Sequence, residues 1–357
     1  MICLTFTNNA TFAKIQESSQ NAKQEVKQTR PFKVFMILFA KNFGECERGF
    51  TNYMRSRGIN IEYTIRDCNG QLSGCPLEKY IAEAKQMQPD LIYTWGTPVT
   101  SRVAGVMGEI DPEKHITKIP IIALPIANPI GADLTTKMKN PTGRNLAGVS
   151  QMMSVVEQIR AIRIYGDFKR IGAIYTPYEP NISTFIDEWH REAQRLKGTK
   201  EEFEFVSYQI GLDASGKLDR SSIPKLLKKL LENNIQFLYM GPDTAILEHR
   251  DLIIDWCLEN KIPIFASSEL TINKVKPTLG FFSRFYHVGQ LAGLIAEKIL
   301  LKRYGNSKEK FPGKVFQFQT LKHMSYTVNV EDGIKMGQPP PIVLIKFAEI
   351  IKREAEE

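Results

Sequence analysis

Polar side chains follow several apolar segments of this chain directly, and they carry groups that could bind a ligand or take part in catalysis. Thr97 and Pro98 follow DLIYTWG, and Asn128 follows IPIIALPIA. The same pattern returns further along, where apolar segments are followed by Tyr178, Glu179, Asn181, Asp243, Thr244, Ser267 and Ser268. Such hydroxyl, amide and carboxylate groups either cap the next helix or hydrogen-bond a small polar ligand, and both interpretations are open at this point.

Motifs of the common enzyme classes do not account for these residues. No GxGxxG follows the first apolar segment, neither HExxH nor GxSxG occurs, and no histidine has a local partner that marks a nucleophile's base. GLDASGKL, at 211–218, has the glycine and lysine spacing of a phosphate-binding loop, but Leu218 stands where Ser or Thr would hold magnesium. We therefore expect a protein that is not an enzyme, with no catalytic residue and no cofactor.

Composition excludes several other classes. The chain is 43% hydrophobic and 24% charged, which is typical of a globular protein, and no apolar run approaches the ~20 residues of a spanning helix. The net charge of +8 is spread along the chain without a basic arm, zinc finger or aromatic-basic motif. We expect a solvated basic surface and no nucleic-acid partner.

The five cysteines do not form a metal pattern, because no CxxC pair occurs and no histidine lies at ligand spacing. Cys68 and Cys75 flank the turn-rich NGQLSG, so they pair in an oxidising compartment or stay free thiols. Cys257 lies in an apolar helical stretch and is expected to be buried.

The N-terminal segment 1–32 differs from the rest. MICLTFTNNATFA has a short apolar start but no basic n-region, and KIQESSQNAKQEVKQTRP is polar and rich in Gln and Lys. We expect a flexible tether or the remnant of an export signal here, with the signal itself incomplete.

Strand-like and helix-like segments alternate from Lys33 onward. The pattern predicts strands over 33–39, 59–67 and 90–96, with helices between them. Thr97 is expected to cap a further helix that begins at Pro98. This alternation favours a parallel sheet with right-handed crossovers, so the loops that carry the polar residues lie at one sheet edge.

The stretch 119–150 interrupts this series, and a second series of the same kind follows it. Ser154 and Glu157 have the spacing of a capping box, and Asp243 is expected to cap a helix over 244–261. The pattern then predicts an apolar helix over 286–305, which needs a broad surface to pack against. A β-rich segment over 313–330 follows, and it needs a sheet to join. We therefore expect two α/β lobes, with the chain crossing between them several times through a hinge.

Six blocks keep a common order and spacing between Lys33 and Pro341. They are LIYTWGTPVTSRVAG, IPIIALPIANPIGADL, GRNLAGVSQMMSVVEQI, KRIGAIYTPYEPNIS, YMGPDTAI and IPIFASSELTINKVKPTLGFFSRFYHVGQLAGLIAEKIL. Together they resemble the ABC transporter substrate-binding proteins of the tryptophan/tyrosine-type family.

The resemblance implies a type I periplasmic-binding-protein fold of two Rossmann-like lobes with three hinge crossings. We expect lobe 1 over 33–150 plus about 280–305, lobe 2 over 151–279 plus about 306–330, and a C-terminal tail over 331–357 packed on the lobes. It also implies a monomer that captures a small polar molecule, such as an amino acid, for a membrane permease. The location would be periplasmic or on the outer side of the cytoplasmic membrane.

The resemblance further implies a ligand site between the lobes. Thr97, Pro98, Asn128 and Ser150 or Gln151 would lie on the first-lobe and hinge side, with Thr97 offering a hydroxyl and a backbone N–H to a carboxylate. The residues that would face them are Tyr178, Glu179, Asn181, Asp243, Thr244, Ser267, Ser268 and Phe281. Either Glu179 or Asp243 would neutralise an ammonium group, and Tyr178 or Phe281 would pack on the apolar part of the ligand.

Four positions depart from the family pattern. Members commonly carry an Asp where this chain has Asn128, Gln151 and Ser268, and an Asn where it has Thr244. Fewer acids near the cleft weaken the case for a zwitterion, because a buried ammonium needs a counter-charge, and they make a less basic or anionic ligand plausible. A sensor module of the same fold is the alternative function, and a Rossmann-type enzyme is third.

Overall fold

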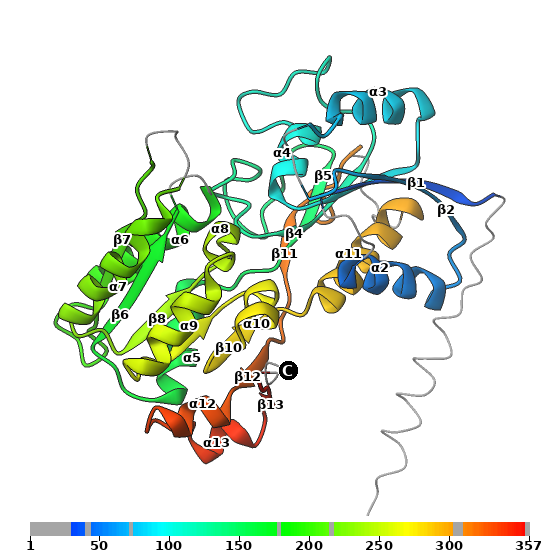
Figure 1. The fold of residues 1–357 in the computed structure, drawn as a ribbon. Helices are drawn as coiled ribbons and strands as arrows, with labels where there is room; N and C mark the ends of the chain where they lie inside the picture. The colour runs from blue at the N-terminus through cyan, green and yellow to red at the C-terminus, as the bar shows by residue number, and fades with distance from the viewer. Residues whose placement is uncertain are drawn as a thin grey trace, which may run out of the picture.

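The computed structural model describes residues 30–39, 44–70, 74–176, 180–213, 218–302 and 310–353. These residues form two α/β lobes, each built on its own sheet of mostly parallel strands (Figure 1). The predicted fold class is therefore confirmed. In the described part of the chain, no helix is both long enough and apolar enough to span a bilayer.

The first lobe holds a six-stranded parallel sheet in the order β11-β5-β4-β3-β1-β2. Its strands are β1 (Phe32–Leu38), β2 (Ile61–Asp67), β3 (Leu91–Trp95), β4 (Ile121–Ile126), β5 (Leu146–Ser150) and β11 (Phe318–Thr320). β4 and β5 are buried along their whole length, as expected for parallel strands covered on both faces.

Two helices cover each face of this sheet. α3 (Leu77–Met87) and α4 (Thr97–Ala104) pack on one face, and α2 (Glu45–Ser56) and α11 (Phe285–Leu300) pack on the other. α2 and α11 are in backbone contact, because a Cβ on Gly49 would lie 1.9 Å from the Tyr286 carbonyl oxygen and one on Gly289 would lie 1.9 Å from that of Cys46. The apolar helix expected over 286–305 thus buries its surface against the first lobe.

The second lobe holds a seven-stranded sheet in the order β13-β12-β10-β9-β8-β6-β7, in which only the β10–β12 pairing is antiparallel among the described strands. Its strands are β6 (Arg170–Tyr175), β7 (Glu204–Gln209), β8 (Phe237–Met240), β9 (Ile264–Ala266), β10 (Leu279–Phe282), β12 (Ser325–Val328) and β13 (Glu349–Ile350).

Helices again cover both faces of this sheet. α5 (Val155–Tyr165) and α6 (Pro180–Leu196) pack on one face, and Trp189 of α6 is fully buried there. The other face carries α7 (Ile223–Glu232), preceded by the 3₁₀ turn η1 (Arg220–Ser222), together with α8 (Thr244–Leu247), α9 (Arg250–Glu259) and α10 (Glu269–Val275). The helix expected over 244–261 is in fact two helices, since α9 begins afresh after His249.

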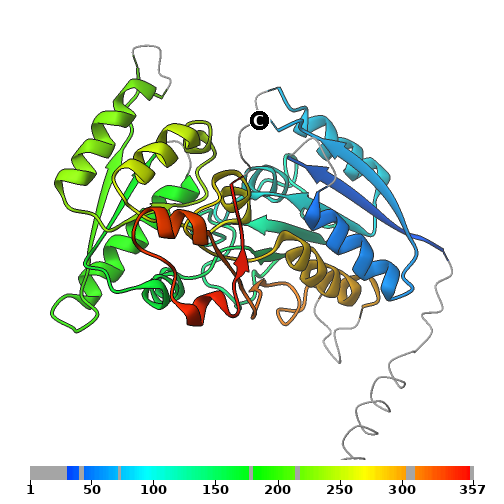
Figure 2. The same cartoon turned by 60° about the horizontal axis from the view of Figure 1, so that its bottom comes forward.

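The chain crosses between the lobes at 150–155, 282–285 and 320–325. The expected boundaries near 280 and 306 therefore shift, because β10 pairs in the second sheet and β11 in the first. The expected C-terminal tail is part of the second lobe, where β13 pairs with β12, beside α12 (Val330–Lys335) and α13 (Ile342–Ile345) (Figure 2). The short strand β13 thus forms the edge of the second sheet. Its sequence pattern alone does not predict this pairing.

Side chains of α10 and β13 hold the middle crossing. The Phe285 backbone N–H donates to Glu269 Oε2 at 2.5 Å, and Arg284 pairs with both Glu269 and Glu349. Cys68 and Cys75, left open above, form a disulfide that closes the loop after β2, and Cys257 is buried as expected.

Candidate functional site

The carboxyl ends of the strands lie toward the boundary between the lobes. β5, β10 and β11 each pass into the other lobe from this end of their sheet. The loops that follow the neighbouring strands therefore line the boundary, which is where ligands bind in open parallel sheets.

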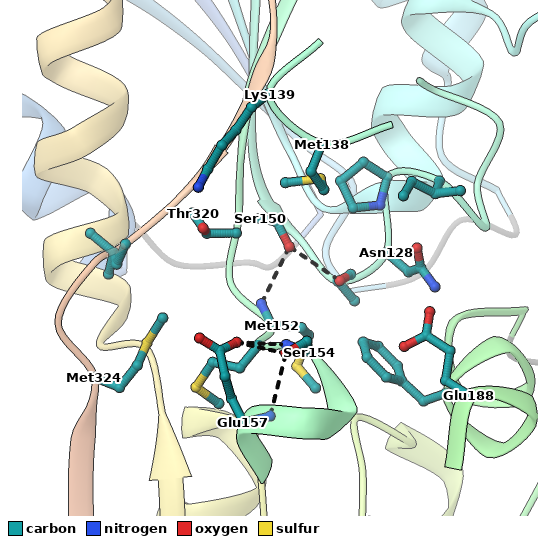
Figure 3. Close-up of a pocket in the computed structure, with 16 residues that line it drawn as sticks. Asn128, Met138, Lys139, Ser150, Met152, Ser154, Glu157, Glu188, Thr320 and Met324 are labelled. Atoms are coloured by element: carbon teal, nitrogen blue, oxygen red, sulfur yellow. Dashed lines mark hydrogen bonds between the residues drawn. The ribbon is translucent and has the colours of Figure 1, made fainter. Parts of the chain in front are cut away.

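A pocket of about 380 Å³ lies at this boundary (Figure 3). Its walls come from both lobes and from two of the three crossings. The residues that line it are Ala127, Asn128, Pro129, Ile130, Met138, Lys139, Ser150, Met152, Met153, Ser154, Glu157, Phe185, Glu188, Thr320, Leu321 and Met324. The volume lies within the range of small-molecule sites, and an apolar wall with a few polar groups is their usual composition.

Asn128 and Ser150 are the two expected site residues that line this pocket. Asn128 is buried, and its Oδ1 accepts a hydrogen bond from the Gly131 backbone N–H at 2.9 Å, which fixes the loop after β4. Ser150 Oγ donates to the Ala127 carbonyl and accepts from the Met152 backbone N–H, each at 3.3 Å. Both side chains are thus oriented by the first crossing and its neighbouring loop.

The loop after β4 also approaches the second lobe. A Cβ on Gly131 would lie 2.6 Å from Thr184 Oγ1 and 3.0 Å from Asn128 Nδ2. Thr184 lies in the first turns of α6, so glycine at position 131 permits a close approach between the lobes beside the pocket.

The capping box predicted at the start of α5 is present at the floor of the pocket. Ser154 Oγ accepts from the Glu157 backbone N–H, and Glu157 Oε2 accepts from the Ser154 backbone N–H at 3.0 Å. Glu157 therefore has one carboxylate oxygen committed to its own helix.

Asp243 is a structural residue in its present arrangement. Its side chain is buried, and its oxygens accept hydrogen bonds from the Thr176 backbone N–H at 2.8 Å, from Thr176 Oγ1 and from the Ile246 backbone N–H. It caps α8, as predicted, and also ties the end of β6 to the end of β8.

Thr97 does not cap α4 as the sequence predicted. The helix begins at Thr97 itself, and Gly96 is the residue before it, with a φ of 84° that favours glycine. Thr97 is largely buried at the helix N-terminus, with Pro98 next to it in the first turn. A sharp turn at glycine replaces the expected hydroxyl cap.

The serines after β9 are engaged within the second lobe. Ser267 Oγ lies 3.2 Å from the Tyr239 hydroxyl oxygen, and Ser268 Oγ accepts from the Thr271 backbone N–H at the start of α10. Phe281 is buried on β10, with its ring centroid 4.5 Å from that of Tyr326.

The remaining expected residues lie partly within and partly outside the described part of the chain. Gln151 lies at the first crossing, where its side-chain Oε1 is buried and has no hydrogen-bond partner among the described residues. Asn181 and Thr244 lie in the first turns of α6 and α8. Tyr178 and Glu179 lie outside the described residues.

Glu188 is a pocket residue that the strand-end pattern does not include. It lies mid-way along α6, three residues after Phe185, and is half-buried. Burial raises the pKa of its carboxyl group above the ordinary value, Glu192 adds to that, and Arg191 opposes it. Its position next to the buried Trp189, at the margin of the apolar face of α6, is the sequence signal that could have indicated it.

Among the described residues, no group of three His, Cys, Asp or Glu side chains is placed to hold an ion.

Comparisons with known proteins agree with the fold. The family described as ABC transporter substrate binding protein matches residues 42–331. A tyrosine-binding protein of Clostridioides difficile (strain R20291) is 24% identical over 263 residues, which cover 72% of this chain and 68% of that protein.

Two solved structures have the same architecture. A substrate-binding protein with adhesive properties from Clostridium difficile, in a ligand-free, open form, gives a TM-score of 0.69 at 19% identity and covers 90% of this chain and 100% of its own. An ABC domain from Streptococcus pneumonia in complex with L-Trp gives a TM-score of 0.67 at 17% identity with the same coverage. Since the family match spans most of the sequence, the chain belongs to the ABC transporter substrate-binding proteins.

Proposed function

We propose that this protein captures an amino acid or a related small polar molecule at the boundary between its lobes and presents it to the permease of an ABC importer. The observation that carries the proposal is the composition of the pocket, whose walls come from both lobes and from two crossings. A change in the angle between the lobes alters such a pocket directly, so a solute that contacts both walls favours the closed arrangement.

Asn128 and Ser150 are proposed as polar contacts of the solute, because both line the pocket. Thr97, Pro98 and Gln151 on the first-lobe and hinge side extend the proposed site along the boundary. Its opposite side is made by Tyr178, Glu179, Asn181, Asp243, Thr244, Ser267, Ser268 and Phe281. Asp243 contributes in this proposal by holding the loops after β6 and β8, since its oxygens are already hydrogen-bonded.

The solute class follows from the relatives and from the pocket walls. One relative is a tyrosine-binding protein and one structural neighbour holds L-Trp. The methionine, leucine and phenylalanine side chains of the present pocket suit an apolar body. The protein would act as a monomer, in the periplasm or anchored on the outer side of the cytoplasmic membrane, and the family match favours this role over that of a sensor module.

A thermal-shift screen against the twenty amino acids, their amines and small organic acids tests the proposal. A binding solute raises Tm in a concentration-dependent way, because it binds only the folded state. Small-angle X-ray scattering with the best solute is expected to show a smaller radius of gyration when the lobes close. The absence of any stabilising solute would contradict the proposal.

A further inference from the structure

An ammonium group in a desolvated pocket needs a carboxylate. Of the two acids expected to provide it, Glu179 lies outside the described residues. Asn128 is an amide at a position where an acid was expected from the family. Asp243 has its oxygens hydrogen-bonded to Thr176 and Ile246. The described acids that line the pocket are therefore the candidates for this contact, an inference that rests on the proposed function.

Glu188 meets the geometric requirement. It lines the pocket from α6, and its carboxyl group points from the second lobe toward the side chain of Asn128 in the first (Figure 3). Asn128 Oδ1 is engaged by Gly131, so this loop presents a fixed amide opposite the carboxylate. The pair forms a polar corner that spans the two lobes.

The other charged groups of the pocket are less suited to this role. Glu157 is exposed, and its Oε2 accepts hydrogen bonds from the Ser154 N–H and hydroxyl groups. Lys139 is exposed on the loop that runs beside β11, where its backbone N–H donates to the Phe318 carbonyl. Glu188 is thus the half-buried acid of the pocket, whereas Glu157 and Lys139 are exposed.

The wall beside this corner is apolar and polarisable. Phe185 lies three residues before Glu188 on the same helix face, and Met138, Met152 and Met324 approach from the first lobe and the two crossings. Thioether and aromatic groups pack well on the aliphatic or aromatic body of an amine, and an aromatic ring also attracts its cation.

From this arrangement we infer that Glu188 is the residue that recognises the solute, by pairing with a primary ammonium group, and that the site selects organic ammonium compounds with an apolar body. A carboxylate on the same solute would extend toward Lys139 at the exposed rim and is not required for binding. Closing the lobes brings Asn128 and Glu188 onto the ammonium group together.

A matched set of three compounds tests the ligand class by calorimetric titration of the full chain. L-Tyrosine carries both charges, tyramine lacks the carboxylate, and 3-(4-hydroxyphenyl)propionate lacks the ammonium group. We expect tyramine to bind within about tenfold of tyrosine. The acid should bind at least about thirtyfold more weakly than tyrosine, because it would leave the carboxylate of Glu188 desolvated and unpaired. An acid that binds as tightly as the amine would overturn the inference.

A pair of matched variants tests the residue. Glu188→Gln keeps the shape of the side chain and removes its charge, and Glu192→Gln makes the same change one turn further along α6, at a residue that pairs with Arg195. We expect E188Q to weaken tyrosine and tyramine binding about thirtyfold or more and E192Q to leave both unchanged. Circular dichroism of each variant establishes that it is folded.

The outcomes separate this inference from the function it rests on. If tyrosine, tyramine and the remaining amino acids and amines all fail to stabilise the wild-type chain, then the proposed function and the inference fall together. If one of them binds and E188Q binds it with unchanged affinity, then solute capture stands and the role of Glu188 is refuted.

Discussion

Two acids of the second lobe show how differently a carboxylate can be used at one boundary. Asp243 follows β8 directly, is buried, and gives its oxygens to backbone and hydroxyl donors on two neighbouring loops. Glu188 lies mid-way along α6, is half-buried, and lines the pocket between the lobes. Asp243, at the position expected for a ligand contact, thus stabilises the fold, whereas Glu188, which was not expected, lines the pocket.

The difference has a physical cause. A carboxylate just before a helix competes for the unpaired N–H groups of the first turn, so the geometry that brings it to the sheet edge also satisfies it. A carboxylate within a helix has no such donors, because the backbone N–H groups there bond within the helix. If it borders a pocket, it keeps its hydrogen-bonding capacity for a solute.

The largest effect should come from removing the structural acid. Asp243→Ala leaves the Thr176 and Ile246 N–H groups without their acceptor in a buried site, so we expect a loss of about 2 to 4 kcal/mol in the free energy of unfolding. Chemical denaturation measures this loss. Asp251→Ala, at an exposed residue of α9, is the control, and equal stabilities for the two variants would refute the contrast.

The pH dependence of solute binding should follow Glu188. Its pKa is raised by burial, with Glu192 acting in the same direction and Arg191 against it. Lys139 and Glu157 are the other charged residues that line the pocket. An ammonium solute needs the ionised carboxylate, so affinity for tyramine is highest above that pKa and falls as the pH drops through it.

Calorimetric titrations between about pH 4 and about pH 8 check this sign. We expect the fall to begin at a higher pH than the ordinary glutamate value of 4.5 would give, and the profile of E188Q to be nearly flat. A wild-type profile as flat as that of the variant would show that Glu188 does not hold the ammonium group.

A smaller effect is expected where the lobes approach each other. Gly131→Ala places a Cβ 2.6 Å from Thr184 Oγ1, so the loop after β4 must move away from α6. We expect a several-fold loss of solute affinity, which adding Thr184→Ala should restore in part because it removes the closest of the atoms that clash. The thermal-shift response to solute in the single and double variants measures the loss and its restoration. A double variant that binds solute as weakly as the single variant would indicate that the alanine distorts the loop itself.

The smallest expected effect is a slight gain in the stability of E188Q, opposite in sign to the loss expected for Asp243→Ala. Glu188 has a raised pKa, which means that its charged form is less favourable in the folded chain than in the unfolded one. Its charge therefore lowers stability above that pKa, and E188Q should be as stable as the wild type or slightly more so, by up to about 0.5 kcal/mol. Denaturation at neutral pH without solute checks this, and a clear loss of stability would assign Glu188 a structural role.

The elements of the fold follow from the sequence because each carries its own signal. The buried strands β1, β3 and β4 are largely apolar runs, and Ser154 with Glu157 marks the start of α5. The exact crossings do not follow in the same way. Which sheet receives β10, β11 and the two-residue β13 depends on pairing between distant segments, and their short apolar runs suit either lobe.

The site follows from the sequence only in part, for a related reason. Asn128 follows β4 and is found by the strand-end pattern, whereas Ser150, the last residue of β5, was expected only from the family resemblance. Glu188 enters the pocket only because α6 packs on the face of the second sheet that meets the loop after β4. That placement is set by how the lobes meet, which no local pattern in α6 encodes.

The most direct test compares variants of Asp243 and Glu188 in the same two measurements. Asp243→Asn and Glu188→Gln are each measured by chemical denaturation and by titration with the solute that gives the largest thermal shift. The expected result is that D243N loses stability and, once folded, retains most of its affinity, and that E188Q keeps its stability and loses about thirtyfold or more in affinity. Two variants that lose affinity and stability in the same proportion would contradict it.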